Sequence, residues 1–179
     1  MKTSFNRLQF VPLESKHYNL LFTLWHQPEL IQYTYHPYIE TIEEAQLRVN
    51  KILNHYQSAE PLAGPYLVFN DQNFIGYCGM DQVESTVKSF EIWYLISPAY
   101  HGQGYGTETA KMLLQIAFEK LNALSVTADV VKQNLASIRI LEKNGFKQIE
   151  ELPLMFNRNG ITTDLLKYSL SKEDWLIEH

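Results

Sequence analysis

The spacing of hydrophobic residues changes several times along the chain, and each spacing predicts an element. Residues 5–13 alternate loosely between apolar and polar, which predicts a short strand that ends at Pro12. Apolar side chains then recur at helical spacing in residues 17–26, and again in a stretch that follows Thr41. Thr41 and Glu44 have the spacing of a capping box. One strand and two helices are therefore expected in the first third of the chain.

The middle of the chain combines short strands with one strongly amphipathic helix. Strands are expected over Tyr66–Phe69, Phe74–Asp81 and Ser89–Ile96, with turns between them. A glycine-rich loop follows, and a helix begins near Thr107. The apolar residues of this helix recur at helical intervals and are Ala110, Leu113, Leu114, Ala117, Phe118 and Leu121.

Another strand, a helix and two strands complete the pattern. Leu124–Val131 alternates and reads as a strand. Asn134 is suited to cap a helix that runs through Asn144, and Gly145 suits the position just after its end. Phe146–Glu150 and Thr163–Leu170 are expected to form the last strands. This order predicts an α/β fold with a mixed central sheet of about seven strands, flanked by about four helices on both faces.

Composition places the chain among ordinary folded proteins. Its 179 residues, 45% of them hydrophobic and 20% charged, fit a single domain over residues 1–179 with a core from about residue 5 to 170. No apolar run approaches the length of a membrane-spanning helix, and the first residues lack the apolar segment of a secretory signal. The single cysteine, Cys78, cannot form an internal disulfide. We therefore expect a cytoplasmic protein without a membrane partner.

Charge and histidine positions limit the possible partners. The net charge of −5 argues against broad nucleic-acid binding and slightly favours neutral or cationic ligands. The six histidines show no spacing typical of metal ligands, so no metal site is expected.

A loop of alternating glycines, His101–Thr107, lies between a predicted strand and a predicted helix. We call it the glycine loop. Glycine tolerates positive φ and leaves main-chain N–H groups accessible, and the following helix begins with free N–H groups and a positive dipole end. This arrangement suits a phosphate or pyrophosphate group. A P-loop would require a lysine after the last glycine, and the dinucleotide pattern Gly-x-Gly-x-x-Gly fails in both possible frames.

In this setting the loop resembles the acyl-CoA pyrophosphate loop of the GCN5-related N-acetyltransferase (GNAT) family, written Gln/Arg-x-x-Gly-x-Gly/Ala. His101 takes the Gln/Arg place, and Gly104 and Gly106 take the glycine places. The histidine departs from the pattern and leaves open whether its side chain contacts the cofactor. The blocks Glu91–Leu95 and Asn134–Phe146 are similar to the branch that includes the ribosomal-protein N-terminal acetyltransferases. The resemblance covers about residues 5–170 and implies a GNAT fold.

The implied activity is transfer of an acetyl group from acetyl-CoA to a primary amine. Asn134 matches the family asparagine that contacts the pantetheine arm, although a purely structural N-cap is an equally good reading. Ser137 lies one helical turn later, and Leu95 and Ile96 lie where the family's strand pairs with pantetheine. The residues expected to hold the cofactor are Leu95, Ile96, His101, Gly102, Gln103, Gly104, Tyr105, Gly106, Thr107, Asn134 and Ser137.

Glu91 is the expected general base, because several GNAT enzymes have a glutamate at this place on the strand before the glycine loop. A carboxylate in a partly apolar cleft can take the amine's proton directly or through water. The alternative is a surface charge paired with Lys88 or Lys111.

The proton donor for the departing thiolate is open. Many GNAT enzymes use a tyrosine at the position that is Leu141 here, so the usual acid is missing. Ser137 or Tyr105 could replace it, or the thiolate could leave unaided. The expected catalytic residues are therefore Glu91 and Ser137.

The aromatic segment between the two N-terminal helices is the expected acceptor site, with Tyr33, Tyr35 and His36 as its binding residues. A loop fixed to the core by its rings is an equally good reading. The acceptor could be a peptide N-terminus, an amino acid, a polyamine or another small amine. The missing tyrosine and His101 also leave open a non-catalytic CoA-binding sensor or interaction module, and a monomer and a homodimer are both compatible with the sequence.

Overall fold

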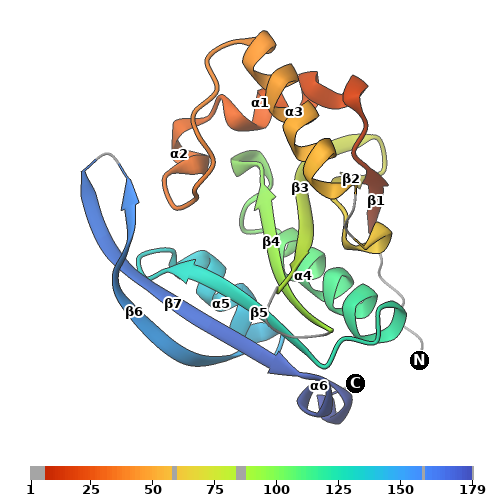
Figure 1. Ribbon diagram of the computed structural model, residues 1–179, viewed down its shortest axis with the longest axis vertical. Helices are drawn as coiled ribbons and strands as arrows, with labels where there is room; N and C mark the ends of the chain where they lie inside the picture. The colour runs from red at the N-terminus through yellow and green to blue at the C-terminus, as the bar shows by residue number, and fades with distance from the viewer. Residues whose placement is uncertain (1–6, 58–59, 84–87, 159, 179) are drawn as a thin grey trace.

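The chain folds around one mixed β-sheet (Figure 1). The computed structural model describes residues 7–57, 60–83, 88–158 and 160–178. Strand order is β1-β2-β3-β4-β5-β7-β6, and β4 and β5 are the parallel pair in an otherwise antiparallel sheet. The strands are β1 (Leu8–Pro12), β2 (Tyr66–Asn70), β3 (Asn73–Gln82), β4 (Ser89–Ile96), β5 (Ser125–Val131), β6 (Lys147–Arg158) and β7 (Ile161–Ser171).

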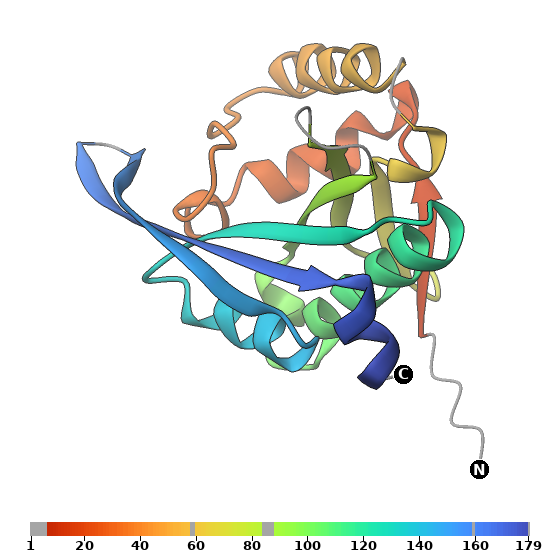
Figure 2. The same cartoon turned by 60° about the horizontal axis from the view of Figure 1, so that its bottom comes forward.

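Helices cover both faces of the sheet, as Figure 2 shows. They are α1 (Tyr18–Trp25), α2 (Pro28–Ile31), α3 (Ile42–Tyr56), α4 (Tyr105–Gln115), α5 (Leu135–Lys143) and α6 (Lys172–Glu178), and α4 continues into a π-helical turn, Ile116–Lys120. α1 and α3 lie on one face, and α4 and α5 lie on the other. The predicted mixed sheet and its four longer helices are confirmed.

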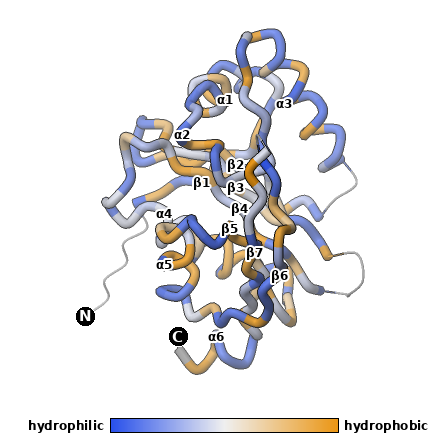
Figure 3. The backbone as a smooth tube through the Cα atoms, turned by 90° about the vertical axis from the view of Figure 1, so that its left-hand side faces the viewer, coloured by the Kyte–Doolittle hydropathy of each residue, from blue (hydrophilic) through white to orange (hydrophobic). Residues whose placement is uncertain are grey.

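Each face carries its own hydrophobic cluster. The α4 face buries the residues that were expected from the helical pattern, including Leu113, Leu114 and Phe118. On the opposite face, Trp25 of α1 and Val49 of α3 pack against the sheet. Figure 3 shows α3 as a mainly hydrophilic helix with hydrophobic positions at intervals, as expected of an amphipathic surface helix. The capping box predicted for α3 is present, because the Thr41 hydroxyl accepts a bond from the Glu44 N–H and Glu44 bonds back to the Thr41 N–H.

The structure differs from expectation in three short or exposed elements. Pro28, expected only to stop α1, occupies the first turn of the four-residue helix α2. β6 extends to Arg158 although most of its side chains are exposed, because it is an edge strand paired with β7 alone. α6 begins where the Ser171 hydroxyl accepts a bond from the Asp174 N–H. The turn expected near residues 84–88 lies largely outside the described residues.

The feature that creates the site is the divergence of β4 from β5. The two strands pair only from Ser89–Ser125 to Glu91–Thr127, and their remaining residues separate. The main chain of β4 beyond Glu91 therefore has a partner on the β3 side alone. Figure 1 shows β4 and β5 running apart, with the N-terminal helices above them and the β6–β7 hairpin beside β5.

Candidate functional site

Two cavities meet where β4 and β5 separate. One, of about 540 Å³, lies among α3, β4, β5 and the loop after α2, and we call it the acceptor cavity. The other, of about 590 Å³, lies between the glycine loop and α5, and we call it the cofactor cavity. Their shared lining marks a junction between them and consists of Tyr33, Thr34, Tyr94, Leu95, Asn134 and Ser137.

The glycine loop has the backbone that its sequence predicts. Gly102 and Gly104 have φ of 75° and 85°, the left-handed region that favours glycine. Gly104 is the N-cap of α4, and no side chain caps this helix end. The first N–H groups of α4 are thus left for another partner, beside the positive end of the helix dipole.

Basic side chains lie on the α5 side of the same cavity. Arg139 and Lys143, one helical turn apart, both line it and are exposed. Arg7 holds the loop from outside through an ion pair of 2.9 Å with Glu108 and a hydrogen bond of 3.2 Å from its Nη2 to the Gln103 carbonyl. The structure thus adds Arg139 and Lys143 to the residues expected to face an anionic ligand.

Four further residues that were predicted to hold the cofactor also line this cavity, namely Leu95, Ile96, His101 and Asn134. Leu95 and Ile96 bury their side chains and line the cofactor cavity at the unpaired edge of β4. His101 uses its Nε2–H to bond the Ile96 carbonyl at 2.7 Å, so its side chain closes the turn between β4 and the loop. Asn134 caps α5 by accepting from the Ser137 N–H at 3.2 Å, and it also lines both cavities. The cap and a contact with a ligand are therefore compatible.

These residues fit acetyl-CoA. A left-handed glycine loop at an uncapped helix end, with two basic side chains opposite, suits the diphosphate. The free edge of β4 offers main-chain groups to the amide-containing pantetheine arm. The arm would end at the junction with the acceptor cavity.

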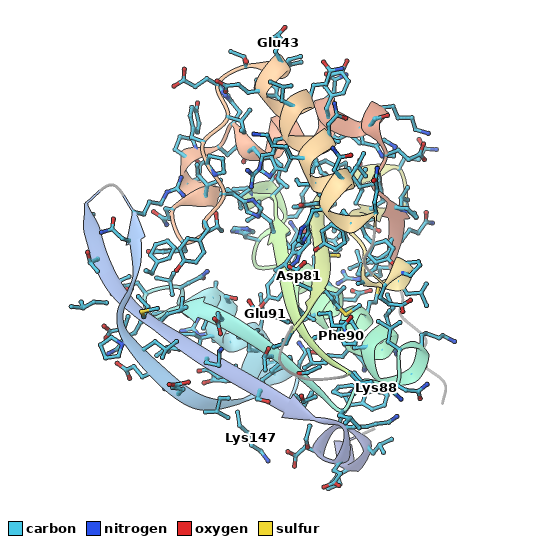
Figure 4. The ribbon with its side chains drawn as sticks, viewed as in Figure 1. Glu43, Asp81, Lys88, Phe90, Glu91 and Lys147 are labelled. Atoms are coloured by element: carbon cyan, nitrogen blue, oxygen red, sulfur yellow. The ribbon has the colours of Figure 1, made fainter. Side chains whose placement is uncertain are left out.

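Glu91 lies in the acceptor cavity, at the last paired position of β4 and β5. Its pKa is raised above the ordinary value, first by burial and then by the negative charge of Asp129. Lys167 of β7 is a nearby basic group that acts in the opposite direction and lowers this pKa. Figure 4 shows Glu91 and Asp81 on neighbouring strands, where they form a cross-strand pair. Among the ion pairs that the described residues form, none joins Glu91 to Lys88 or Lys111.

Two further carboxylates extend this acidic wall. Asp129 of β5 lies 3.8 Å from the Lys167 ammonium through its Oδ1, and that buried oxygen has no hydrogen-bond partner among the described residues. Asp81 accepts bonds from the Tyr56 hydroxyl at 2.6 Å and from the Trp93 indole at 2.9 Å. The acidic wall, defined as Asp81, Glu91 and Asp129, lines one side of the acceptor cavity.

A pair of hydroxyl groups occupies the junction. The Tyr94 hydroxyl and Ser137 Oγ share a hydrogen bond of 2.9 Å, and burial raises the pKa of Tyr94 well above its usual range. Tyr105, the other residue considered as a proton donor, lies in the cofactor cavity but not at the junction, and its hydroxyl accepts a bond from Asn70. Tyr94 was not expected from the sequence, because its role depends on which face of β4 turns toward α5.

The predicted acceptor residues line the acceptor cavity and are also fixed by neighbouring rings. His36 stacks on Trp25 with ring centroids 6.3 Å apart, and Tyr35 packs edge-on against Phe156 at 4.9 Å. Tyr33 lines both cavities. Both readings of this segment are thus compatible with its geometry. Within the described residues, no group of three or more His, Cys, Asp and Glu side chains is placed to hold a metal ion, and no helix is long and apolar enough to cross a membrane.

Comparison with known proteins identifies the family. A family model described as "Acetyltransferase (GNAT) domain" matches residues 7–147 of the chain. The chain belongs to the GNAT acetyltransferase family. The FsC-acetyl coenzyme A-N(2)-transacetylase of Aspergillus fumigatus is 29% identical over 95% of this chain and 76% of that protein. The spermidine N(1)-acetyltransferase of Escherichia coli K12 is 27% identical over 94% of this chain and 88% of that protein.

Solved structures agree in fold with this GNAT chain. A spermidine N-acetyltransferase from Vibrio cholerae, in complex with CoA and spermine, has a TM-score of 0.82 at 19% identity and covers 95% of this chain and 98% of its own. RimL, a ribosomal L7/L12 alpha-N-protein acetyltransferase in complex with CoA, also has a TM-score of 0.82, at 20% identity, covering 92% and 93%. The protein is accordingly an acetyl-CoA-dependent N-acetyltransferase.

Proposed function

We propose that this GNAT enzyme acetylates a primary amine that enters the acceptor cavity, with Glu91 as its general base. The observation that carries the proposal is the position of Glu91, which lines the acceptor cavity at the point where β4 and β5 separate. A cationic ammonium is attracted to the acidic wall, and it must lose a proton before its nitrogen can react. Burial and Asp129 make Glu91 more basic than an ordinary glutamate, which suits that task.

Acetyl-CoA, when bound, supplies a thioester whose carbon–sulfur bond breaks as the amide bond forms. Gly102, Gly104 and the first turn of α4 hold its diphosphate, and the free edge of β4 orients its pantetheine arm. Glu91 removes the proton from the amine directly or through water. The Tyr94 hydroxyl, bonded to Ser137 Oγ at the junction, donates a hydrogen bond to the leaving sulfur and stabilises the thiolate, which then takes a proton from solvent. The family pattern would place a tyrosine at position 141, where this chain has a buried leucine. We assign the role of that tyrosine to the pair formed by the Tyr94 and Ser137 hydroxyl groups.

The small-molecule relatives support an amine of modest size. Two of the related proteins are named as a spermidine N(1)-acetyltransferase and as an FsC-acetyl coenzyme A-N(2)-transacetylase. The acceptor cavity of about 540 Å³ has room for a small amine or the first residues of a peptide.

The test is consumption of acetyl-CoA thioester with a panel of amines, coupled to mass spectrometry of the products. An acetylated amine with free CoA in equal amount supports the proposal. Release of CoA at the same rate with and without every amine would overturn it.

A further inference from the structure

The acceptor cavity contains an arginine that forms no ion pair with any residue that the structure describes. Arg48 of α3 lines this cavity together with residues of the strands that carry the acidic wall. None of the ion pairs within 4 Å that the described residues form involves Arg48. A partly buried charge without a counter-ion is unfavourable, so it calls for a functional explanation.

The contacts of Arg48 hold its side chain without neutralising it. Its Nη2 donates to His36 Nδ1 at 2.9 Å, and its guanidinium lies over the Trp25 ring at 5.4 Å. The pKa of His36 is lowered to about 4 by burial and by two nearby arginines, so its ring is neutral at pH 7 and brings no charge of its own. Nε of Arg48 is buried and has no hydrogen-bond partner in the part of the chain that the structure describes. The guanidinium is thus positioned by neutral groups and keeps unused donors.

The carboxylates of the acidic wall belong to the other end of the cavity. Trp25 and His36, which contact Arg48, both pack against Tyr77, and Tyr77 pairs with Leu95. Asp81 pairs with Glu91 on the same two strands. This pair lies four residues from the pair of Tyr77 and Leu95, a distance of roughly 13 Å along the strands. The charged groups that act on Glu91 are Asp129, Lys167 and Asp81. The cavity therefore has an acidic end at Glu91 and a cationic end at Arg48.

We propose that Arg48 binds a carboxylate of the acceptor, so that the substrate is an amine that also carries an acid group. The inference rests on the proposed N-acetylation and specifies its substrate class. The amine of such a molecule faces the acidic wall, and its carboxylate pairs with the guanidinium, whose planar fork matches a carboxylate. A polyamine lacks this anion and would place a second positive charge near Arg48, so the geometry disfavours it.

The experiment compares matched acceptors, namely β-alanine, γ-aminobutyrate and ε-aminocaproate, each against its methyl amide, with spermidine as a further arm. The expected result is a kcat/KM higher for the acid than for its amide by about 10- to 100-fold in at least one pair, the worth of a hydrogen bond to a charged group. The amine of the methyl amide is less basic than that of the acid, so a larger fraction of it is neutral and able to react. This difference favours the amide, so a higher kcat/KM for the acid cannot result from it. Arg48→Gln should reduce this ratio by about the same factor, and Arg48→Lys should restore part of it.

Lys51→Gln is the matched control, because Lys51 lies on the same helix and lines the same cavity but is exposed. It should change the ratio less than about 2-fold, since an exposed charge is well screened. An equal loss in this variant would show a general field effect and overturn the pairing. If Arg48→Gln slows acid and amide equally, Arg48 only supports the fold of the site. If spermidine and the amides are the better acceptors, the inference fails while the proposed N-acetylation stands. If no amine increases thioester consumption, the proposed function itself fails.

Discussion

Glu91 owes its chemistry to side chains that come from three other strands. Asp81 of β3 and Asp129 of β5 raise its pKa, Lys167 of β7 lowers it, and burial has the largest effect. The Glu91 side chain is neither fully exposed nor fully enclosed. A carboxylate in this setting can exchange protons with a bound amine and with solvent.

Replacing Glu91 by Gln keeps its size and removes its basicity. We expect kcat to fall roughly 10²- to 10⁴-fold at neutral pH, the usual contribution of general acid–base catalysis. This corresponds to about 3–5 kcal/mol in barrier height. Steady-state kinetics with one acceptor measure the effect, and calorimetry should show unchanged CoA affinity. Glu119→Gln, an equivalent change at an exposed position of the α4 continuation, should keep the full rate. A Glu91→Gln rate equal to that of this control would remove Glu91 from the mechanism.

The charges around Glu91 predict how the pH profile moves. Activity requires the Glu91 carboxylate, so kcat/KM falls as the pH drops through its raised pKa. Asp129→Asn removes a negative charge that opposes ionisation, so the acid limb of the profile should move to lower pH. Lys167→Met removes a positive charge that favours ionisation, so the limb should move to higher pH. If the pH profiles of both variants coincide with the profile of the unaltered protein, a group other than Glu91 determines the acid limb.

At the scale of the element, local signals predicted those parts of the site that depend on few neighbours. The capping box of Thr41 and Glu44 predicts the start of α3, and the glycine loop predicts that α4 starts without a side-chain cap. Both are properties of consecutive residues, so the sequence alone contains them. α2 was missed because four residues are too few to show a period. The sequence predicts too short a β6, because an exposed edge strand lacks the alternation of apolar and polar residues that marks a half-buried strand.

Gly104→Val tests the glycine loop as a cradle. A Cβ at Gly104 would approach only Arg7 Nη2, at 3.7 Å, so the substitution is opposed by backbone conformation and not by crowding. Valine resists the φ of 85°, and the loop must rearrange away from the diphosphate site. We expect CoA affinity to fall by at least about 10-fold, since several main-chain hydrogen bonds to an anion are displaced. Isothermal calorimetry measures it.

Gly160→Val is the control for this substitution, because Gly160 has a φ of 77° in open space at the turn between β6 and β7. The two variants share the backbone strain, of about 1–3 kcal/mol, but only Gly104 belongs to the cofactor cavity. Equal CoA affinity in both variants, each shown to be folded by circular dichroism, would refute the diphosphate assignment.

At the scale of the whole molecule, the acceptor cavity joins segments that are far apart in sequence. Arg48, Glu91 and Asp129 lie on α3, β4 and β5, and they line one cavity at the place where β4 and β5 separate. No local pattern marks Arg48, since an arginine on an amphipathic helix usually faces solvent. The family resemblance indicated Glu91, but it carried no information on Asp129, Tyr94 or Arg48. The positions of these three side chains follow from the topology of the sheet. The order of elements in the sequence suggests that topology, but it does not give the distances between the side chains.

The β6–β7 hairpin, from the other end of the chain, holds in place the loop after α2 that carries Tyr35 and His36. Arg158 Nη1 donates to the carbonyls of Thr34 and His36, both at 2.8 Å, and the Tyr35 hydroxyl donates to the Met155 carbonyl at 3.2 Å. Figure 1 shows the hairpin reaching toward the segment after α2. Loss of the Arg158 bonds should therefore affect the acceptor side of the site and leave the cofactor side intact.

Arg158→Gln should lower stability by about 1–3 kcal/mol, the value of hydrogen bonds to a charged group at a half-buried position. At this chain length each kcal/mol lowers Tm by about 2–4 °C, which calorimetry resolves. The acceptor KM should rise while the Kd for CoA is unchanged. Lys120→Gln, a charge removal at an exposed position, should leave both Tm and KM unaltered.

Arg158→Lys separates charge from geometry. Arg158 helps to lower the pKa of His36 to about 4, so its removal in Arg158→Gln should raise that pKa, because a nearby cation no longer opposes protonation of the ring. Lysine retains the cation but cannot reproduce the forked donor that serves two carbonyls. An NMR titration should therefore find the His36 pKa still low in Arg158→Lys, while the acceptor KM rises as in Arg158→Gln. If KM instead follows the His36 pKa across the two variants, the hairpin acts on the acceptor through charge and not by positioning the loop.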